Sequence, residues 1–160
     1  MDPSEVPLLT RRRIEAAALA QVYRVLSDGL GEDAALEIIG RAVAADAREA
    51  GRRFAQAARP GPSLEHFATV LDRWRAGGAL TIEGVRCGGG LLEFRVTRCA
   101  YVEAYRAMGL PPALAYPLSC GRDAAFASGY RVGLTLERSP TLAEGSSACR
   151  FRFRWGAPEG

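Results

Sequence analysis

The sequence predicts an α+β domain in which N-terminal helices pack on an antiparallel sheet of about four strands. Apolar residues follow helical spacing through the first half of the chain, and an alternation with period two replaces it after Gly77 and Gly78. The length of 160 residues fits one domain with its own core. We therefore expect a single domain over residues 1–160, with short disordered ends and a helical insert between two strand hairpins.

The first half should contain three helices. Residues 11–26 and 32–56 carry apolar stripes, and the short turn at residues 27–31 makes these two helices an antiparallel hairpin. A third helix begins at the N-cap residue Ser63 and runs through Trp74 to Gly77 and Gly78. Each of these helices should present one apolar face to the sheet.

The second half should contain four strands and a helical insert. The apolar and alternating segments place strands at 79–85, 91–97, 130–138 and 147–155. Between the second and third strands we expect a short helix over 101–108 and a longer one over 112–126. Pro117 and Gly121 should interrupt the longer helix.

Composition excludes several classes of chemistry. The net charge is +3, and arginine supplies all of the positive side-chain charge because the chain has no lysine. A lysine Schiff base, covalent pyridoxal phosphate chemistry and a Walker-type phosphate loop are thereby excluded. The single histidine, His66, excludes a multi-histidine metal cage within one chain.

The expected partners follow from charge and hydropathy. Arg150, Arg152 and Arg154 form a basic stripe on the last strand, but no nucleic-acid recognition motif accompanies them, so we expect no nucleic-acid partner. No apolar run approaches the roughly 20 residues that span a bilayer, and the acidic N-terminus is unlike a signal peptide. We expect a cytoplasmic protein with no membrane partner and with reduced cysteines.

Cys120 and Asp123 are the leading candidates for chemistry. On a helix their three-residue spacing places both side chains on one face. A thiol near a helix start beside Arg122 would have its thiolate favoured, and the carboxylate could orient an amine or amidine or move a proton. The alternative is a small core residue beside a surface carboxylate.

Two further cysteines extend this candidate site. Cys99 lies at a strand-to-helix junction, where nucleophiles are often presented, but it could equally be a core thiol. Cys149 shares one strand face with two phenylalanines and could also be core. Cys99, Cys120 and Cys149 with Asp123 would give zinc four donors, yet their spacing lacks any metal signature. We expect no cofactor and keep zinc as an alternative.

Several of these segments resemble the L-2-amino-thiazoline-4-carboxylic acid hydrolase family from about residue 10 to 155. The resemblance is carried by Cys99-Ala100-Tyr101 with Glu103 and Tyr105, Met108-Gly109-Leu110, Cys120 with Asp123 and Phe126, Leu136 to Thr141, Glu144-Gly145 and Cys149-Arg150-Phe151. The closing pattern is also similar to 4-vinyl reductase domains, which are related in fold to transport-particle subunits. This kinship implies an α+β fold and a homodimer.

The resemblance implies cysteine-dependent hydrolytic opening of a small cyclic amidine or thiazoline carboxylate at a non-peptide carbon–nitrogen bond. Cys120 would be the preferred nucleophile and Cys99 the next, with Asp123 holding the amidinium. Substrate contacts would come from the residues Arg122, Tyr101 and Arg150. The alternative is a sensor or accessory domain that binds a small molecule or metal without transforming it. An enzyme of this kind should contain one cavity thiol with a depressed pKa.

Overall fold

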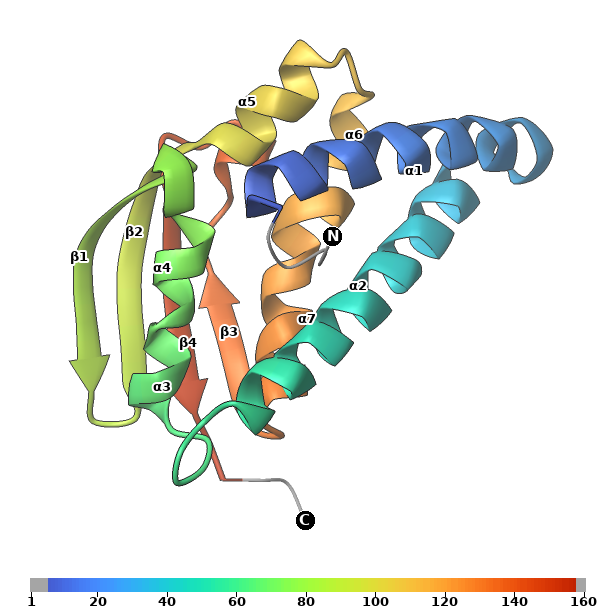
Figure 1. The fold of residues 1–160 in the computed structure, drawn as a ribbon. Coiled ribbons are helices and arrows are strands. Elements are labelled where there is room, and N and C mark those ends of the chain that lie inside the picture. The colour runs from blue at the N-terminus through green and yellow to red at the C-terminus, as the bar shows by residue number, and fades with distance from the viewer. Residues whose placement is uncertain (1–5, 158–160) are drawn as a thin grey trace.

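The computed structural model describes residues 6–157 and shows an α+β fold (Figure 1). The predicted disordered ends lie outside the described residues. Its α-helices, in chain order, are α1 (Leu8–Leu30), α2 (Glu32–Gln56), α3 (Leu64–Ala68), α4 (Val70–Trp74), α5 (Ala100–Ala107), α6 (Pro112–Ala115) and α7 (Gly121–Tyr130). Short 3-10 turns occupy Ala76–Gly78 and Leu142–Glu144, and a π-helical segment occupies Tyr116–Cys120.

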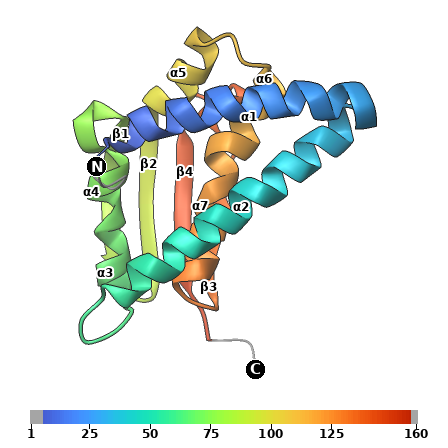
Figure 2. The same ribbon diagram turned by 45° about the vertical axis from the view of Figure 1, so that its right-hand side comes forward.

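The sheet contains four antiparallel strands, as predicted. They are β1 (Leu80–Gly88), β2 (Leu91–Cys99), β3 (Leu134–Arg138) and β4 (Cys149–Trp155), in the spatial order β1-β2-β4-β3. Figure 2 shows α1, α2, α4 and α7 in front of one face of this sheet. The central pairing of β2 with β4 brings Phe94 opposite Phe151. The helices therefore cover one face and leave the other to solvent.

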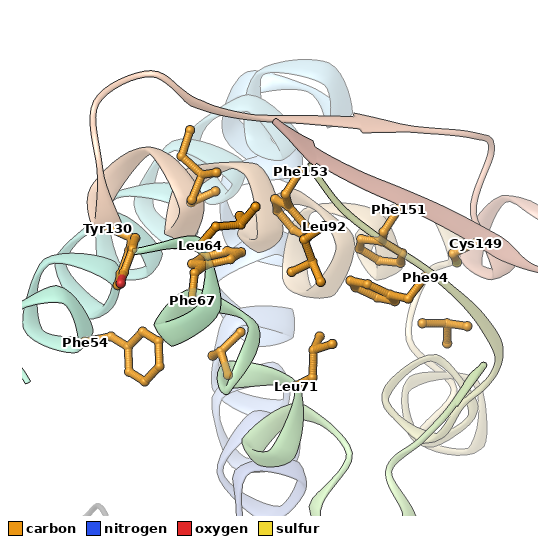
Figure 3. Close-up of a cluster of buried hydrophobic side chains, with 14 residues drawn as sticks. Phe54, Leu64, Phe67, Leu71, Leu92, Phe94, Tyr130, Cys149, Phe151 and Phe153 are labelled. Atoms are coloured by element: carbon orange, nitrogen blue, oxygen red, sulfur yellow. The ribbon is translucent and has the colours of Figure 1, made fainter. Parts of the chain in front are cut away.

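Residues that alternate along the strands build the main core on the covered face. Phe94 and Phe151 stack with ring centroids 4.7 Å apart, and Phe67 meets Phe153 edge to face at 5.0 Å. Figure 3 shows these rings from the sheet facing side chains from α2, α3 and α7. The edge-to-face and offset arrangements are those that aromatic rings prefer when they pack. A second cluster lies beneath α1, α2, α5 and α6.

Two glycines allow α2 and α7 to cross in direct backbone contact. A Cβ atom on Gly51 would lie 2.8 Å from the Tyr130 nitrogen, and one on Gly129 would lie 2.8 Å from the Arg48 Cα. Real Cβ atoms essentially never approach that closely, so only glycine fits at either position. This crossing fixes the position of α7, whose N-terminal end carries Cys120 and Asp123.

The observed elements depart from the prediction mainly at their ends. The turn predicted at residues 27–31 is wrong, because α1 continues to Leu30 and Gly31 alone (φ 88°) redirects the chain. The third helix is divided at Thr69 into α3 and α4, although Ser63 caps it as expected by accepting a hydrogen bond from the His66 amide. The strand expected from Tyr130 begins only at Leu134, because α7 continues through Tyr130.

The helix predicted over 112–126 is three consecutive segments. α6 is followed by the π-helical residues Tyr116–Cys120, and α7 then continues to Tyr130. Pro117 lies inside the π segment, which agrees with the expected interruption because proline cannot donate to the preceding turn. The π segment therefore ends at Cys120, directly before the first residue of α7.

Candidate functional site

A cavity of about 730 Å³ lies between the inner face of the sheet and the helices. Its wall includes residues from α1, α2, α4, α5 and α7 as well as β2 and β4. Six of the residues singled out from the sequence line it, namely Cys99, Tyr101, Cys120, Arg122, Asp123 and Cys149. Tertiary closure thus brings together three of the four cysteines from three different elements. Cys87 is exposed on β1 and does not belong to this wall.

Cys120 occupies the N-cap position of α7, where the π segment ends. Its side chain is buried and its Sγ donates a hydrogen bond of 3.7 Å to the Thr141 Oγ1. The Thr141 hydroxyl in turn donates to the Glu144 carboxylate at 2.9 Å. Glu144 closes a capping box on the 3-10 turn that follows β3, so Thr141 is held firmly. This hydrogen bond therefore orients the Cys120 thiol toward Thr141.

Asp123 lies one turn further along α7 and pairs with Arg138 from β3. The Arg138 guanidinium also donates to the Cys120 carbonyl at 2.9 Å and to the Tyr116 hydroxyl at 3.3 Å. Only 8% of the Arg138 side chain and 21% of the Asp123 side chain are exposed. Burial raises the pKa of Asp123 to about 6, while the Arg138 charge opposes this shift. Asp123 can consequently exchange a proton near neutral pH.

The surroundings disfavour a resting thiolate at each of the three cavity cysteines. Burial raises the pKa of Cys120 to about 12, and the nearby Asp123 charge adds to this effect. Burial also raises the pKa of Cys99 and of Cys149, although backbone amides donate to both sulfur atoms. The Leu142 amide, for example, lies 3.1 Å from the Cys149 Sγ. All three groups are thiols at neutral pH.

Arg122 does not stabilise a Cys120 thiolate as the sequence suggested. Its guanidinium points to Glu15 of α1 at 2.9 Å and to Asp46 of α2 at 2.8 Å, and its Nε donates to the Leu118 carbonyl at 2.9 Å. Arg122 therefore connects α7 to α1 and α2. The prediction failed because sequence proximity does not show which way a long side chain turns.

The two other residues expected to contact substrate lie in different places. Tyr101 lines the cavity and donates from its hydroxyl to the Trp74 carbonyl at 3.0 Å, and burial raises its pKa to about 12. Arg150 is exposed on β4, opposite Arg95 of β2, and is not part of the cavity wall. The placement of Arg150 at the substrate site is therefore corrected, because the strand alternation turns it to the solvent face.

Other cavity residues were not found by reasoning from the sequence. Arg138 lies within the segment that carried the family resemblance, and its spacing from Asp123 gave no sign of their pairing. Trp74 from α4 and Arg11 from α1 also line the cavity. The contribution of Arg11 depends on the way α1 passes across the sheet, which helical periodicity alone does not specify.

Neither a metal cluster nor a membrane-spanning helix occurs in the described part of the chain. Within residues 6–157, no group of three or more histidine, cysteine, aspartate or glutamate side chains is arranged to hold a metal ion. None of the helices in the same range has the length and apolar character needed to cross a bilayer.

The chain is similar to known proteins in both sequence and fold. A sequence model described as L-2-amino-thiazoline-4-carboxylic acid hydrolase matches residues 11–153. None of the curated proteins matches the chain. The fold is similar to the crystal structure of the phenol-responsive sensory domain of the transcription activator PoxR, solved with phenol. That likeness has a TM-score of 0.55 at 18% identity and covers 87% of this chain and 73% of the sensory domain.

Proposed function

Because this chain belongs to the L-2-amino-thiazoline-4-carboxylic acid hydrolase family, we propose that its cavity hydrolyses a carbon–nitrogen bond of a cyclic amidine or thiazoline-type carboxylate. The observation that carries the proposal is the position of Asp123 on a wall shared with three thiols. Asp123 is the one acidic residue among the described residues that line the cavity. A buried carboxylate in such a place binds an amidinium by a charge-assisted hydrogen bond.

In the proposed reaction the Cys120 sulfur adds to the amidine carbon of the ring, which forms a carbon–sulfur bond. Asp123 carries the thiol proton to the ring nitrogen, and the bond between this nitrogen and the amidine carbon breaks. Water then adds to the same carbon and the carbon–sulfur bond breaks, with the proton returning to Cys120 through Asp123. The sum is one substrate and one water giving one ring-opened product.

The electrostatics of the cavity bear directly on this mechanism. A thiol with a pKa of about 12 is protonated at neutral pH, so attack requires that substrate binding first lower this pKa. A bound amidinium supplies a positive charge beside Cys120 and has that effect. Thr141 holds the Cys120 thiol in place through the hydrogen bond described above. Cys99 shares the wall and is the second candidate nucleophile.

A binding or sensing function is the second candidate, and one observation favours it. Burial raises the pKa of all three cavity thiols, whereas a resting cysteine nucleophile is usually activated by a depressed pKa. In this function the same cavity would hold a small molecule without transforming it. The fold likeness to a sensory domain is compatible with this candidate, but fold alone does not determine function.

The experiment uses 2-amino-thiazoline-4-carboxylate as the test substrate and follows ring opening by mass spectrometry. Cys120→Ser should abolish turnover with little change in melting temperature, because a hydroxyl replaces a thiol of similar size. Cys87→Ser is the matched control, since Cys87 is exposed and lies outside the cavity. If Cys120→Ser kept full activity, Cys99 would become the candidate nucleophile. Binding of the compound without turnover by the unaltered protein would favour the sensing function.

A further inference from the structure

The cavity is too large to be filled by a single five-membered ring. Its volume of about 730 Å³ falls within the roughly 300–1,000 Å³ that pockets for drug-sized ligands enclose. At about 30 Å³ per molecule in the liquid, the same space would hold about 24 waters. A one-ring substrate bound at Asp123 would therefore leave most of the cavity unoccupied. A ligand that fits this space has a body larger than its reacting group.

Much of the cavity wall is apolar, which sets the chemistry of that body. Aromatic and aliphatic side chains from the sheet and from the helices line it, among them Phe54, Val70, Trp74, Phe94, Phe126 and Phe151. Water against such a surface is displaced favourably by hydrocarbon, at a gain of about 0.8 kcal/mol per methylene. The wall therefore favours an aromatic or acyl body over a polar one.

The charged residues of the wall are mostly cationic. Besides Arg122 and Arg138, four arginines line the cavity, namely Arg11, Arg12, Arg53 and Arg73. Arg12 pairs with Glu15 at 2.6 Å, and Arg53 lies 3.8 Å from Glu49. Arg11 and Arg73 make no ion pair with any of residues 6–157, and Arg73 lies over the Phe54 ring at 5.0 Å. These two guanidinium groups keep their capacity to bind an anion.

Arg11 carries a second sign of an incomplete site. Its Nε atom is buried, yet it meets no hydrogen-bond acceptor within the described part of the chain. Buried polar atoms in folded proteins are nearly always paired, so the Arg11 guanidinium has donor capacity that the described residues leave unused. A carboxylate suits this position because the guanidinium fork matches its two oxygens.

We propose that the ligand of this cavity is an amphipathic carboxylate whose carboxylate is bound by Arg11 and Arg73. Its aromatic or acyl body fills the apolar part of the cavity (the apolar chamber). This inference rests on the proposed function only in treating the cavity as the substrate site. It extends that function by naming a substrate with a long apolar body in place of a single small ring. Ligand binding tests it without any requirement for turnover.

Trp74 supplies a reporter of binding. The chain has two tryptophans, and Trp155 of β4 lies outside the cavity wall beneath the Arg131 guanidinium. In a Trp155→Phe background, the fluorescence of Trp74 can be followed while straight-chain carboxylates from butanoate to tetradecanoate are titrated. We expect affinity to rise about fourfold per methylene until the chamber is full and then to level off. A flat series would overturn the apolar chamber as the binding site.

The anion site is tested by comparing each carboxylate with the alcohol of the same length. Arg11→Gln and Arg73→Gln should each weaken carboxylate binding by about tenfold or more and leave alcohol binding unchanged. Arg13→Gln is the matched control, because Arg13 is an exposed α1 residue that does not line the cavity. Equal affinities for carboxylate and alcohol in the unaltered protein would overturn the anion site.

Filling the chamber tests where the body lies. Ala50 of α2 lines the cavity, so Ala50→Phe should shorten the chain length at which affinity levels off. Ala45→Phe on the exposed side of the same helix should not. If Ala50→Phe fails to fold by thermal melting, Ala57→Leu provides a second filling variant, since Ala57 also lines the cavity. An unchanged length profile in a folded filling variant would contradict the proposal.

The outcomes separate this proposal from the proposed function. Tight binding of long carboxylates without hydrolysis of the thiazoline compound would support the amphipathic ligand and refute the one-ring thiazoline as the substrate. Efficient hydrolysis of the one-ring substrate, together with a flat carboxylate series, would support the hydrolase and refute the amphipathic ligand.

Discussion

The close crossing of α2 and α7 makes a sharp prediction for the variant Gly51→Ala. The added methyl would lie 2.8 Å from the Tyr130 backbone nitrogen and closer still to the Phe126 carbonyl oxygen. Favourable non-bonded carbon contacts occur at about 3.5–4.0 Å, so the helices would have to separate by about 1 Å or more. The obstructing atoms belong to the α7 backbone and cannot move by changing a rotamer.

The magnitude follows from two opposing terms. Overpacking of a tight interface costs about 1–3 kcal/mol, and the rigid backbone here places Gly51→Ala at the upper end of that range. Replacing a helical glycine by alanine contributes about 1 kcal/mol in the other direction. We therefore expect a net loss of about 2 kcal/mol in the free energy of unfolding. For a chain of this size that corresponds to a fall of about 4–8 °C in melting temperature.

Gly40→Ala is the matched control within the same helix. Its Cβ would lie 3.7 Å from the Pro117 Cβ, which is an ordinary van der Waals contact. The propensity gain then remains, and the variant should be more stable by up to about 1 kcal/mol.

Urea denaturation followed by circular dichroism would give both unfolding free energies, provided that the dependence on urea stays the same in each variant. A Gly51→Ala protein as stable as Gly40→Ala would refute the close crossing. An equal loss of unfolding free energy in both variants would show that any glycine substitution in α2 destabilises the protein, whether or not it lies at this contact.

Three further predictions concern the cavity and the assembly. Asp123 has a pKa of about 6 and acts as a carboxylate when it binds the amidinium, so kcat/KM should fall as the pH drops through about 6. Asp123→Asn should remove both the activity and this inflection. An unchanged pH profile in that variant would exclude Asp123 as the titrating group. Iodoacetamide at pH 8 should label the exposed Cys87 first and the three cavity cysteines slowly, because burial raises their pKa values; rapid labelling of Cys120 in a Cys87→Ser protein would contradict the site described here. Light scattering at micromolar concentration should report a homodimer, and a monomer would contradict that expectation. Elemental analysis should find no stoichiometric zinc. One zinc per chain would make Cys99, Cys120 and Cys149 its candidate ligands.

Local periodicity predicted most of the fold because the elements are strongly patterned. The stripe of α2 gave both of its ends, and the alternation of Cys149, Phe151 and Phe153 gave the buried face of β4. The errors occur where the local sequence fits either a helix or a turn. The α1 boundary was placed too early because Asp28 and Gly29 look like a turn, yet backbone hydrogen bonding continues through them to Gly31. Tertiary packing decides such cases.

The candidate site was predictable in its residue types but not in its electrostatics. Cys120 and Asp123 lie three residues apart, and both line the cavity. The cation that pairs with Asp123 is Arg138, fifteen residues away along the chain, whereas the adjacent Arg122 pairs with Asp46. Pairing of this kind depends on the docking of β3 against α7. Spacing along one helix carries no information about it.

The ion pair of Asp123 with Arg138 links the two candidate functions of the cavity. A cationic ligand that binds Asp123 must share this carboxylate with Arg138, whose guanidinium retains acceptors in the Cys120 carbonyl and the Tyr116 hydroxyl. Such exchange would place positive charge on both sides of Cys120 and lower the pKa of its thiol. In a hydrolase this change activates sulfur only when substrate is present. In a sensor the same exchange would move β3 relative to α7. Thiol reactivity that rises on addition of a non-hydrolysable amidine would support the first consequence, and unaltered reactivity would refute it.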